Sequence, residues 1–201
     1  MKLLRIDASS RTEGSDSRMV ADQFQQQWLR SNPNGEVIIR DLIKTPIPHI
    51  NQQTIEGFYT PPENFTEELA DATSLSDQLI SELKNTNILL ISTPMYNFGV
   101  PSALKAWIDH IVRINVTFGV TEENAFFGKI QDTKAYIITT AGAVYTSEEM
   151  KALDFLQPYL QTVLGLIGIT DVTFLSLQGT TMDTNFFEKS KAKAVSIIRT
   201  I

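Results

Sequence analysis

The stretch "NILLISTPMYNFGVPSALKAWID" (87–109) decides the fold. It begins as an apolar run, turns through two aromatic residues that flank an asparagine, and continues with helical spacing. A run that is apolar on both faces is typical of a parallel strand covered by helices on both sides. Strands usually end in turns of Gly, Asn, Asp or Ser, so the aromatic turn at 96–98 indicates a flat, partly polar ligand.

The same alternation of apolar runs and helical spacing continues along the chain. Strands are predicted at 2–8, 36–42, 87–93, 134–140 and 171–177, and helices at 15–30, 65–84, 100–113, 147–166 and 183–201. The segment 44–64 is rich in proline and is predicted to lack regular structure. The pattern therefore predicts an α/β fold, a doubly wound five-stranded parallel sheet with helices on both faces, in a single domain over residues 1–201.

Composition excludes several classes of function. The 201 residues carry a net charge of -6, which points to neither nucleic acid nor an anionic membrane as a partner. No apolar run approaches the ~18 residues of a membrane span, and "MKLLRIDASS" is typical of a strand rather than a signal peptide. The chain has no cysteine, which excludes disulfides and thiol chemistry and indicates a cytoplasmic location. Redox chemistry would therefore need a bound cofactor.

The first candidate site is the serine-rich loop "ASSRTEGSDSR" (8–18), which leads from a strand into a helix. Hydroxyls and free N–H groups at a helix N-terminus favour an anion, and Arg11 or Arg18 could add charge. Neither G-x-x-x-x-G-K-[ST] nor G-x-G-x-x-G is present, so a single phosphate is favoured over a pyrophosphate or triphosphate. The alternative is a solvated loop whose serines cap the helix.

Two further loops follow strands that end at the same edge of the sheet. In the first of them, the side chains of Met95, Tyr96, Asn97 and Phe98 suit a flat heterocycle such as a flavin. In the second, "TTAGAVYTS" (139–147), small residues let a ligand approach the backbone. The alternatives are an aromatic roof over the core and an ordinary loop. Ligands bind beyond the carboxyl ends of parallel strands, so the three loops are expected to converge.

Other chemistries lack their motifs. The chain has two histidines, His49 and His110, but it lacks the G-x-S-x-G motif that would supply the serine of a Ser-His-Asp triad. No spacing typical of metal ligands, such as H-E-x-x-H, occurs. The third strand ends in "LLISTP", without the aspartate that a phospho-acceptor domain needs. The sequence therefore predicts no metal site and no catalytic side chain of these kinds.

Four motifs together resemble one family. They are "PMYNF" (94–98), "LKAWID" (104–109), "VTF" (116–118) and "PYLQTVLGLIGITDVTF" (158–174), in addition to the serine loop. The chain resembles the flavodoxin-like FMN-dependent NADH:quinone oxidoreductases, also called azoreductases, over nearly its whole length. The resemblance implies FMN as cofactor, NADH or NADPH as co-substrate, and quinone, azo or nitroaromatic acceptors. It also implies a ping-pong mechanism and a homodimer with the active site at its interface.

The resemblance also implies positions for the FMN contacts. Phosphate-binding positions match Ser10, Ser15, Asp16 and Ser17; the segment along the isoalloxazine matches Met95, Tyr96, Asn97 and Phe98; the loop near its pyrimidine end matches Thr140, Ala141, Gly142 and Ala143.

Two positions depart from the family pattern. Ala141 stands where relatives often carry Arg, and Gly119 and Val120 stand where an aromatic residue is common. Phe126 and Phe127 are candidates to replace that aromatic surface.

Two rival interpretations remain open at this point. One is a flavodoxin-type electron carrier that serves protein partners, and the other is a regulatory fold without a ligand. The additional Pro-rich segment 44–64 and the modest acidity favour an enzyme over a carrier.

Overall fold

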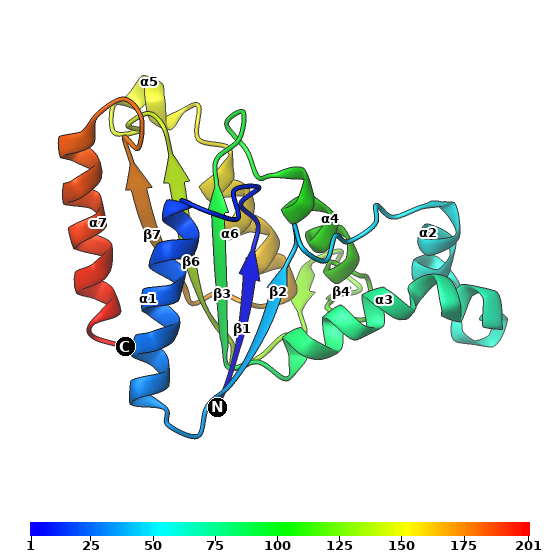
Figure 1. Cartoon of the computed structure of the whole chain (residues 1–201). Helices are drawn as coiled ribbons and strands as arrows, with labels where there is room; N and C mark the ends of the chain where they lie inside the picture. Colours follow the sequence, from blue (N-terminus) through cyan, green and yellow to red (C-terminus); the bar gives the residue numbers. More distant parts are fainter.

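A computed structural model describes residues 1–201 and contains the predicted five-stranded parallel sheet (Figure 1). Its strands are β1 (Lys2–Asp7), β2 (Glu36–Asp41), β3 (Ile88–Pro94), β6 (Lys134–Ala141) and β7 (Val172–Gln178), in the order β2-β1-β3-β6-β7. Every residue of β3 is buried, because this strand lies at the centre of the sheet and is covered on both faces. The prediction from "NILLIST" is therefore confirmed.

Helices cover the sheet on both sides, as predicted. Helices α1 (Asp16–Ser31) and α7 (Thr184–Ile198) cover one face, and Figure 1 shows α1 in front of the strands and α7 to its left. Helices α3 (Glu67–Lys84), α4 (Ser102–Ile111) and α6 (Leu156–Ile167) cover the other. Each face has its own buried apolar cluster, with Phe24 and Trp28 in the first and Trp107 in the second. The two clusters together fix the sheet and its carboxyl edge.

The strand order reverses between β1 and β3. The chain passes from β1 to β2 on one side and then returns to place β3 on the other side of β1. Loops that follow such neighbouring strands leave in opposite directions and open a crevice at the carboxyl edge. The serine-rich loop and the aromatic turn border this crevice.

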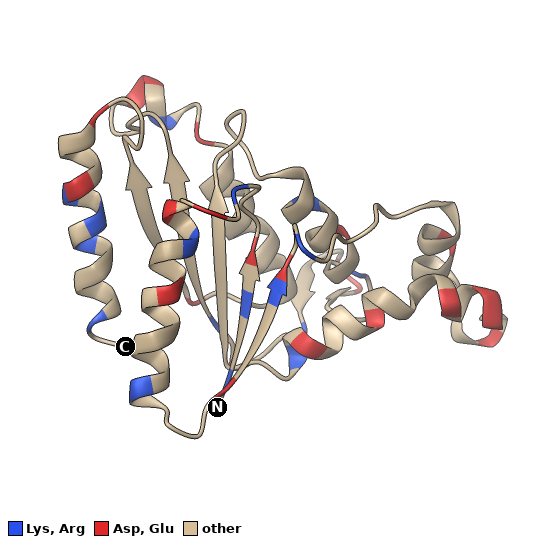
Figure 2. Ribbon diagram, viewed as in Figure 1, with Lys and Arg blue, Asp and Glu red and all other residues tan.

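The prediction that 44–64 lacks regular structure is wrong. The segment contains α2 (Gln52–Tyr59) and a short 3₁₀ turn, η1 (Pro62–Asn64). Its prolines lie at 46, 48, 61 and 62, so they flank the helix without interrupting it. The Asn51 side chain caps α2 by accepting a hydrogen bond of 3.0 Å from the Thr54 N–H. The segment 44–64 is called the arm below. Figure 2 shows it extending away from the sheet, with acidic residues at its outer end.

The prediction of a single helix at 147–166 is also wrong, because the structure has two helices there. Ser147 caps α5 as expected, but α5 (Glu148–Lys151) ends after one turn and α6 begins at Leu156. Pro158 has no N–H with which to continue the helix, and Asp154 Oδ1 accepts from the N–H groups of Leu156 and Gln157 at 2.9 and 3.0 Å. Asp154 thus starts a second helix.

A short hairpin that the sequence did not predict lies between α4 and β6. It pairs β4 (Phe118–Val120) with β5 (Phe126–Gly128) in antiparallel register. A side chain at Gly119 would lie 2.3 Å from the ring of Phe127, so this glycine permits the ring to pack on the backbone. No helix combines the length and apolar character that crossing a bilayer requires.

Candidate functional site

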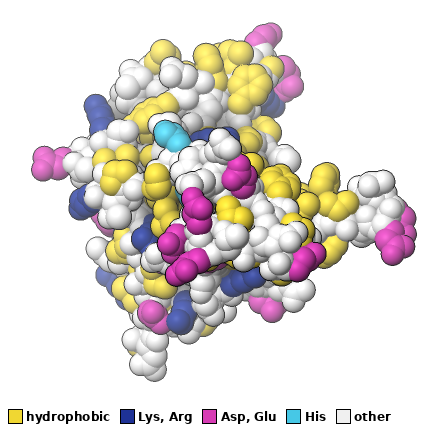
Figure 3. Space-filling view, turned by 90° about the vertical axis from the view of Figure 1, so that its right-hand side faces the viewer, with side chains coloured by type: hydrophobic (Ala, Val, Ile, Leu, Met, Phe, Trp, Pro, Cys, Tyr) yellow, Lys and Arg dark blue, Asp and Glu magenta, His cyan; other side chains and the backbone are white.

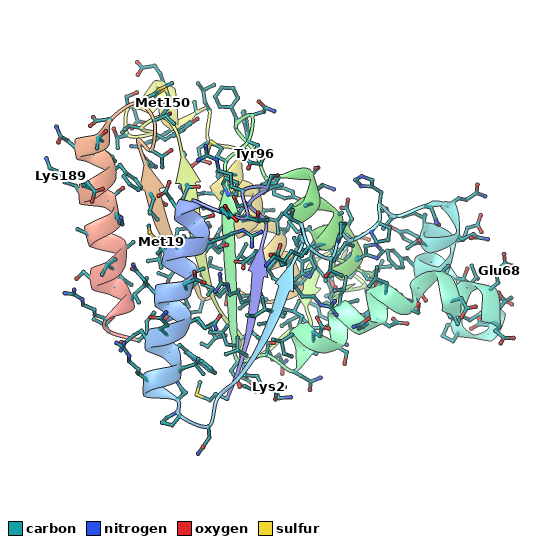
Figure 4. All side chains as sticks on the ribbon, viewed as in Figure 1. Lys2, Met19, Glu68, Tyr96, Met150 and Lys189 are labelled. Carbon is teal, nitrogen blue, oxygen red and sulfur yellow. The ribbon has the colours of Figure 1, made fainter.

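The three loops identified in the sequence begin side by side at the carboxyl edge. The Ala8 N–H donates to the carbonyl of Ser92 at 2.9 Å, and the Met95 N–H donates to the carbonyl of Thr140 at 2.7 Å. These bonds continue the ladders of β1 with β3 and β3 with β6 into the loops. Figure 4 shows Tyr96 and Met150 at this end and Lys2 at the opposite end. The predicted convergence is confirmed.

The first loop forms a cradle of donors at the start of α1. Ser15 is the N-cap, its hydroxyl lies 3.2 Å from that of Ser17, and both residues are buried. Asp16 is the first helical residue, and Ser10 is exposed. The backbone N–H groups of Ser10 and of residues 12–17 have no partner within the chain. Free N–H groups, hydroxyls and the helix dipole together suit a bound anion.

The second loop is a tight two-residue turn with an unusual backbone. Tyr96 and Gly99 exchange N–H···O bonds of 3.1 and 3.0 Å, while Asn97 and Phe98 have φ values of +48° and +68°. Such a turn prefers glycine after asparagine, and a bulky residue at positive φ is strained. Strain of this kind persists where the surrounding structure enforces it, often at a ligand site. The N–H groups of Asn97 and Phe98 have no partner within the chain.

The side chains of this turn are not a roof over the core. Tyr96 is 39% exposed and Phe98 is 45% exposed, whereas Met95 is half-buried and packs against the core. The Phe98 carbonyl accepts a 3.1 Å bond from the Phe155 N–H, which anchors the turn to the segment between α5 and α6. The turn therefore presents aromatic faces and free donors outward on a fixed backbone.

The third loop also has free N–H groups. Residues 179–182 donate to its carbonyls, with the Gly179 N–H bonding to Ala143 and the Thr180 N–H bonding to Ala141 at 3.0 and 3.1 Å. The N–H groups of Gly142, Ala143 and Val144 have no partner within the chain. Val144 was not among the predicted residues. A carbonyl-bearing ligand edge could accept hydrogen bonds from this run.

A buried charge network lies behind the first loop. Arg18 donates to both carboxylate oxygens of Asp41 at 2.7 and 2.9 Å and to the Ser9 carbonyl at 2.9 Å. The hydrogen bond from Arg18 lowers the pKa of Asp41 to about 2. The same hydrogen bond raises the pKa of Arg18. The two terminal nitrogens of Arg18 are therefore engaged by Asp41 and Ser9, and its Nε atom is buried without a partner.

Sequence reasoning missed Asp7 and Asp41 as part of this network. The signal for Asp7 was its position two residues after Arg5 in an otherwise apolar strand, which places both charges on one face.

A groove of about 930 Å³ adjoins the aromatic turn. Its lining includes Gly99 and Val100 from the segment before α4, and Phe155 and Tyr159 from the start of α6. Burial raises the pKa of Tyr159. The groove offers a mainly apolar space beside the exposed ring of Phe98.

The structure shows no arrangement of side chains that would suit the other chemistries considered. No group of three or more His, Asp or Glu side chains lies together as a metal site would require. His110 is buried with its Nε2 atom 3.0 Å from the Pro48 carbonyl. Ala141 ends β6 as a buried residue, and Val120 is 40% exposed on the hairpin.

Comparison with known proteins finds a family model and several relatives that are similar to this chain. A family model described as "Flavodoxin-like fold" matches residues 1–200. The chain is 41% identical over 192 residues to an FMN-dependent NADH:quinone oxidoreductase of Hydrogenovibrio crunogenus, covering 96% of this chain and 95% of the relative. It is 45% identical over 172 residues to an enzyme of the same name from Xanthobacter autotrophicus, with 85% and 82% covered.

Solved structures show the same fold. An azoreductase from Bacillus anthracis superposes with a TM-score of 0.89 at 22% identity, and 100% of each chain is covered. A second protein from that species, an FMN-dependent NADH-azoreductase in complex with FMN, gives a TM-score of 0.86 at 23% identity, with 98% of this chain and 97% of that chain covered.

Proposed function

The chain belongs to the FMN-dependent NADH:quinone oxidoreductases of the flavodoxin-like fold, and on this premise we propose how its site carries out the reaction. The protein is an oxidoreductase that uses FMN and passes two electrons from NADH to quinones or azo compounds. The overall reaction with a quinone is NADH + H⁺ + quinone → NAD⁺ + hydroquinone. The observation that carries the proposal is the strained turn at Asn97 and Phe98, which presents free donors between two loops that also have free donors.

The residues present fit FMN. A single phosphate would accept hydrogen bonds from the N–H groups of Asp16 and Ser17 and from the hydroxyls of Ser10, Ser15 and Ser17. The isoalloxazine would lie along Met95, Tyr96, Asn97 and Phe98, and its pyrimidine end would meet the loop Thr140, Ala141, Gly142 and Ala143. The loop lacks the G-x-G-x-x-G motif that binds a pyrophosphate, and its free donors suit a single phosphate group. FMN is thus favoured over FAD.

Bound FMN supplies the two-electron chemistry, and the protein supplies orientation. Phe98 and the groove beside it provide an apolar surface on which flat molecules can pack. We propose that the nicotinamide and the acceptor use this surface in succession, which is a ping-pong mechanism, and that nitroaromatic compounds are accepted with quinones. No side chain is needed to move a proton for the hydride step itself.

We propose that the protein is a homodimer with the site completed at its interface. Two elements expose large apolar side chains. Tyr59 in the arm is 69% exposed, and Phe126 in the hairpin β4–β5 is 67% exposed. A cavity of about 630 Å³ lies between this arm and residues 113–116. Figure 3 shows hydrophobic side chains interspersed with acidic ones on the face that carries the arm. Large exposed apolar side chains that gather beside a cavity are typical of a protein interface.

We also propose that the chain forms one flavodoxin-like FMN-binding domain over residues 1–201. A single sheet that contains both β1 and β7 supports this proposal. The cytoplasmic location predicted from the absence of cysteine stays a prediction.

Steady-state kinetics test the function. The FMN-loaded protein is assayed with NADH or NADPH against a panel of soluble quinones, azo dyes and nitroaromatic compounds. We expect oxidation of NADH that depends on the acceptor, with parallel lines in double-reciprocal plots as ping-pong kinetics require. Turnover only after a protein partner is added would indicate the electron carrier instead. Intersecting lines would exclude the ping-pong mechanism.

A further inference from the structure

We propose that Arg18 is a positioning residue for the cofactor phosphate, holding the first loop in its binding shape without contacting the phosphate. The proposal rests on the function proposed above. Arg18 lies on the first turn of α1, and its guanidinium reaches back under the loop to the Ser9 carbonyl at 2.9 Å. Ser9 directly precedes Ser10, so this bond fixes the start of the segment that presents the free donors.

Asp41 holds the guanidinium in this position. The carboxylate at the end of β2 receives two hydrogen bonds from Arg18, at 2.7 and 2.9 Å, and is itself fixed by the Ile43 N–H at 3.1 Å. The side chain of Arg18 is 10% exposed and that of Asp41 is 12% exposed. Paired bonds of this kind between a guanidinium and a carboxylate define both distance and orientation. The end of β2 thus determines where the first loop lies.

A second carboxylate, Asp7, connects this pair to the centre of the sheet. Asp7 lies 3.5 Å from Arg18, receives a 2.6 Å bond from the Ser92 hydroxyl and pairs with Arg5 at 3.0 Å. Arg5 in turn pairs with Asp22 of α1 at 2.6 Å. The network therefore joins β1, β2, β3 and α1 at the point from which the first and second loops leave.

The charge balance argues against a direct phosphate contact. Three carboxylates, those of Asp7, Asp22 and Asp41, face two guanidiniums, those of Arg5 and Arg18, so the network has no surplus positive charge. A phosphate dianion would gain little from such a group at long range. The geometry of the loop, rather than attraction by a cation, is what Arg18 provides.

The replacement Arg18→Lys separates these two roles. Lysine keeps the positive charge but is a point charge on a flexible stem, and it cannot bond Asp41 twice while also reaching the Ser9 carbonyl. Arg40→Lys is a matched control. Arg40 is the residue before Asp41 in β2, and it likewise donates to both carboxylate oxygens of a single partner, Glu82. Successive residues of a strand face opposite sides, so Arg40 lies away from the loop.

Titrations of the folded apo-proteins with FMN and with riboflavin, which lacks the phosphate, test the proposal. We expect Arg18→Lys to weaken FMN binding about tenfold and to change riboflavin binding less than about twofold, and Arg40→Lys to change neither. Parent-like FMN affinity in Arg18→Lys would overturn the proposal. Equal losses for both ligands would also overturn it, because the residue would then be structural only.

Asp41→Asn provides a second test that holds even if Arg18→Lys fails to fold. If Asp41 positions Arg18, this variant binds FMN more weakly than the parent while riboflavin affinity is kept. If Arg18 acted as a cation on the phosphate, removal of its counter-charge would tighten FMN binding, and the proposal would be wrong. Failure of the parent itself to bind FMN would instead refute the proposed function.

Discussion

The guanidinium of Arg18 and the carboxylate of Asp41 form paired hydrogen bonds of 2.7 and 2.9 Å that join the first turn of α1 to the end of β2. This pair lies beneath the loop that we assign to the cofactor phosphate. It couples the stability of the edge of the sheet to the ionisation of one carboxylate.

The first prediction concerns the pH dependence of stability. The pKa of Asp41 is about 2 in the folded protein and about 3.8 when the residue is unpaired. A lowered folded pKa stabilises the protein at pH values above the unfolded pKa, and this contribution is lost as the pH falls from about 4 to about 2. A shift of this size corresponds to about 2 kcal/mol of unfolding free energy.

Urea unfolding of the apo-parent and of Asp41→Asn between pH 7 and pH 2 measures this contribution. We expect the parent to exceed the variant in unfolding free energy above about pH 5, and the difference to diminish toward pH 2. A difference that stays constant across this range would show that ionisation of Asp41 does not contribute.

The second prediction concerns strain in the aromatic turn. Phe98 has a φ of +68°, a conformation that costs an L-residue about 1–2 kcal/mol and costs glycine much less. Phe98→Gly creates the Asn-Gly pair that this turn type prefers. Glycine also gives the unfolded chain more freedom, which offsets part of the gain. We expect apo-Phe98→Gly to be more stable than apo-Phe98→Ala by about 1 kcal/mol.

Thermal unfolding of the two apo-variants checks this prediction, because both lack the ring and differ only at the backbone. Both should bind FMN more weakly than the parent. An alanine variant as stable as the glycine variant would show that the turn stores no strain.

The third prediction concerns the homodimer. Replacement of the exposed Tyr59 by glutamate places a charge in the apolar surface of the arm, and we expect light scattering to show a monomer. Ile39→Glu is the control, since Ile39 is 52% exposed on β2, outside the arm, the hairpin and the three loops of the site. A parent that is monomeric and fully active would contradict the proposed dimer. Dissociation of both variants would show that the effect is not specific to the arm.

Much of the fold could be predicted from the sequence because each strand of the five-stranded sheet contains a clear apolar run, unlike the three-residue strands of the hairpin. "NILLIST" contains four consecutive apolar residues, Ile88 to Ile91, and such a run is typical of a strand that helices cover on both faces. The division of 147–166 into two helices was missed because the apolar spacing continues across the break. The break depends on the absent N–H of Pro158 and on the cap by Asp154.

The site was only partly predictable for a related reason. Ser15, Asn97 and Gly142 lie in loops whose sequences indicate hydrogen-bond donors. These loops follow parallel strands that end at one edge of the sheet, so the position of the site could be predicted. Asp41 carries no such signal, because its role arises from contact with Arg18, 23 residues away in sequence. Positive φ at Phe98 is likewise invisible in the sequence, since the surrounding structure rather than residue preference imposes it.

The fourth prediction concerns the identity of the cofactor. Acid release from the purified protein, followed by mass determination, should yield FMN, because the first loop has donors for one phosphate and no pyrophosphate motif. Recovery of FAD would contradict the assignment of that loop.

The central claim is that the flavin ring lies against the turn formed by Asn97 and Phe98. The measurement is an FMN titration of the folded apo-variants Asn97→Ala and Phe98→Ala, with the visible absorbance spectrum recorded and Ser17→Ala as the comparison at the phosphate end. Loss of an aromatic contact costs about 0.5–1.5 kcal/mol, and loss of a net hydrogen bond costs about 1 kcal/mol.

We therefore predict FMN binding weakened several-fold to about tenfold in both turn variants, with an altered spectrum. Ser17→Ala should also weaken binding but leave the spectrum nearly unchanged, because the phosphate is remote from the ring. Parent-like FMN affinity together with an unchanged spectrum in Asn97→Ala and Phe98→Ala would contradict the account.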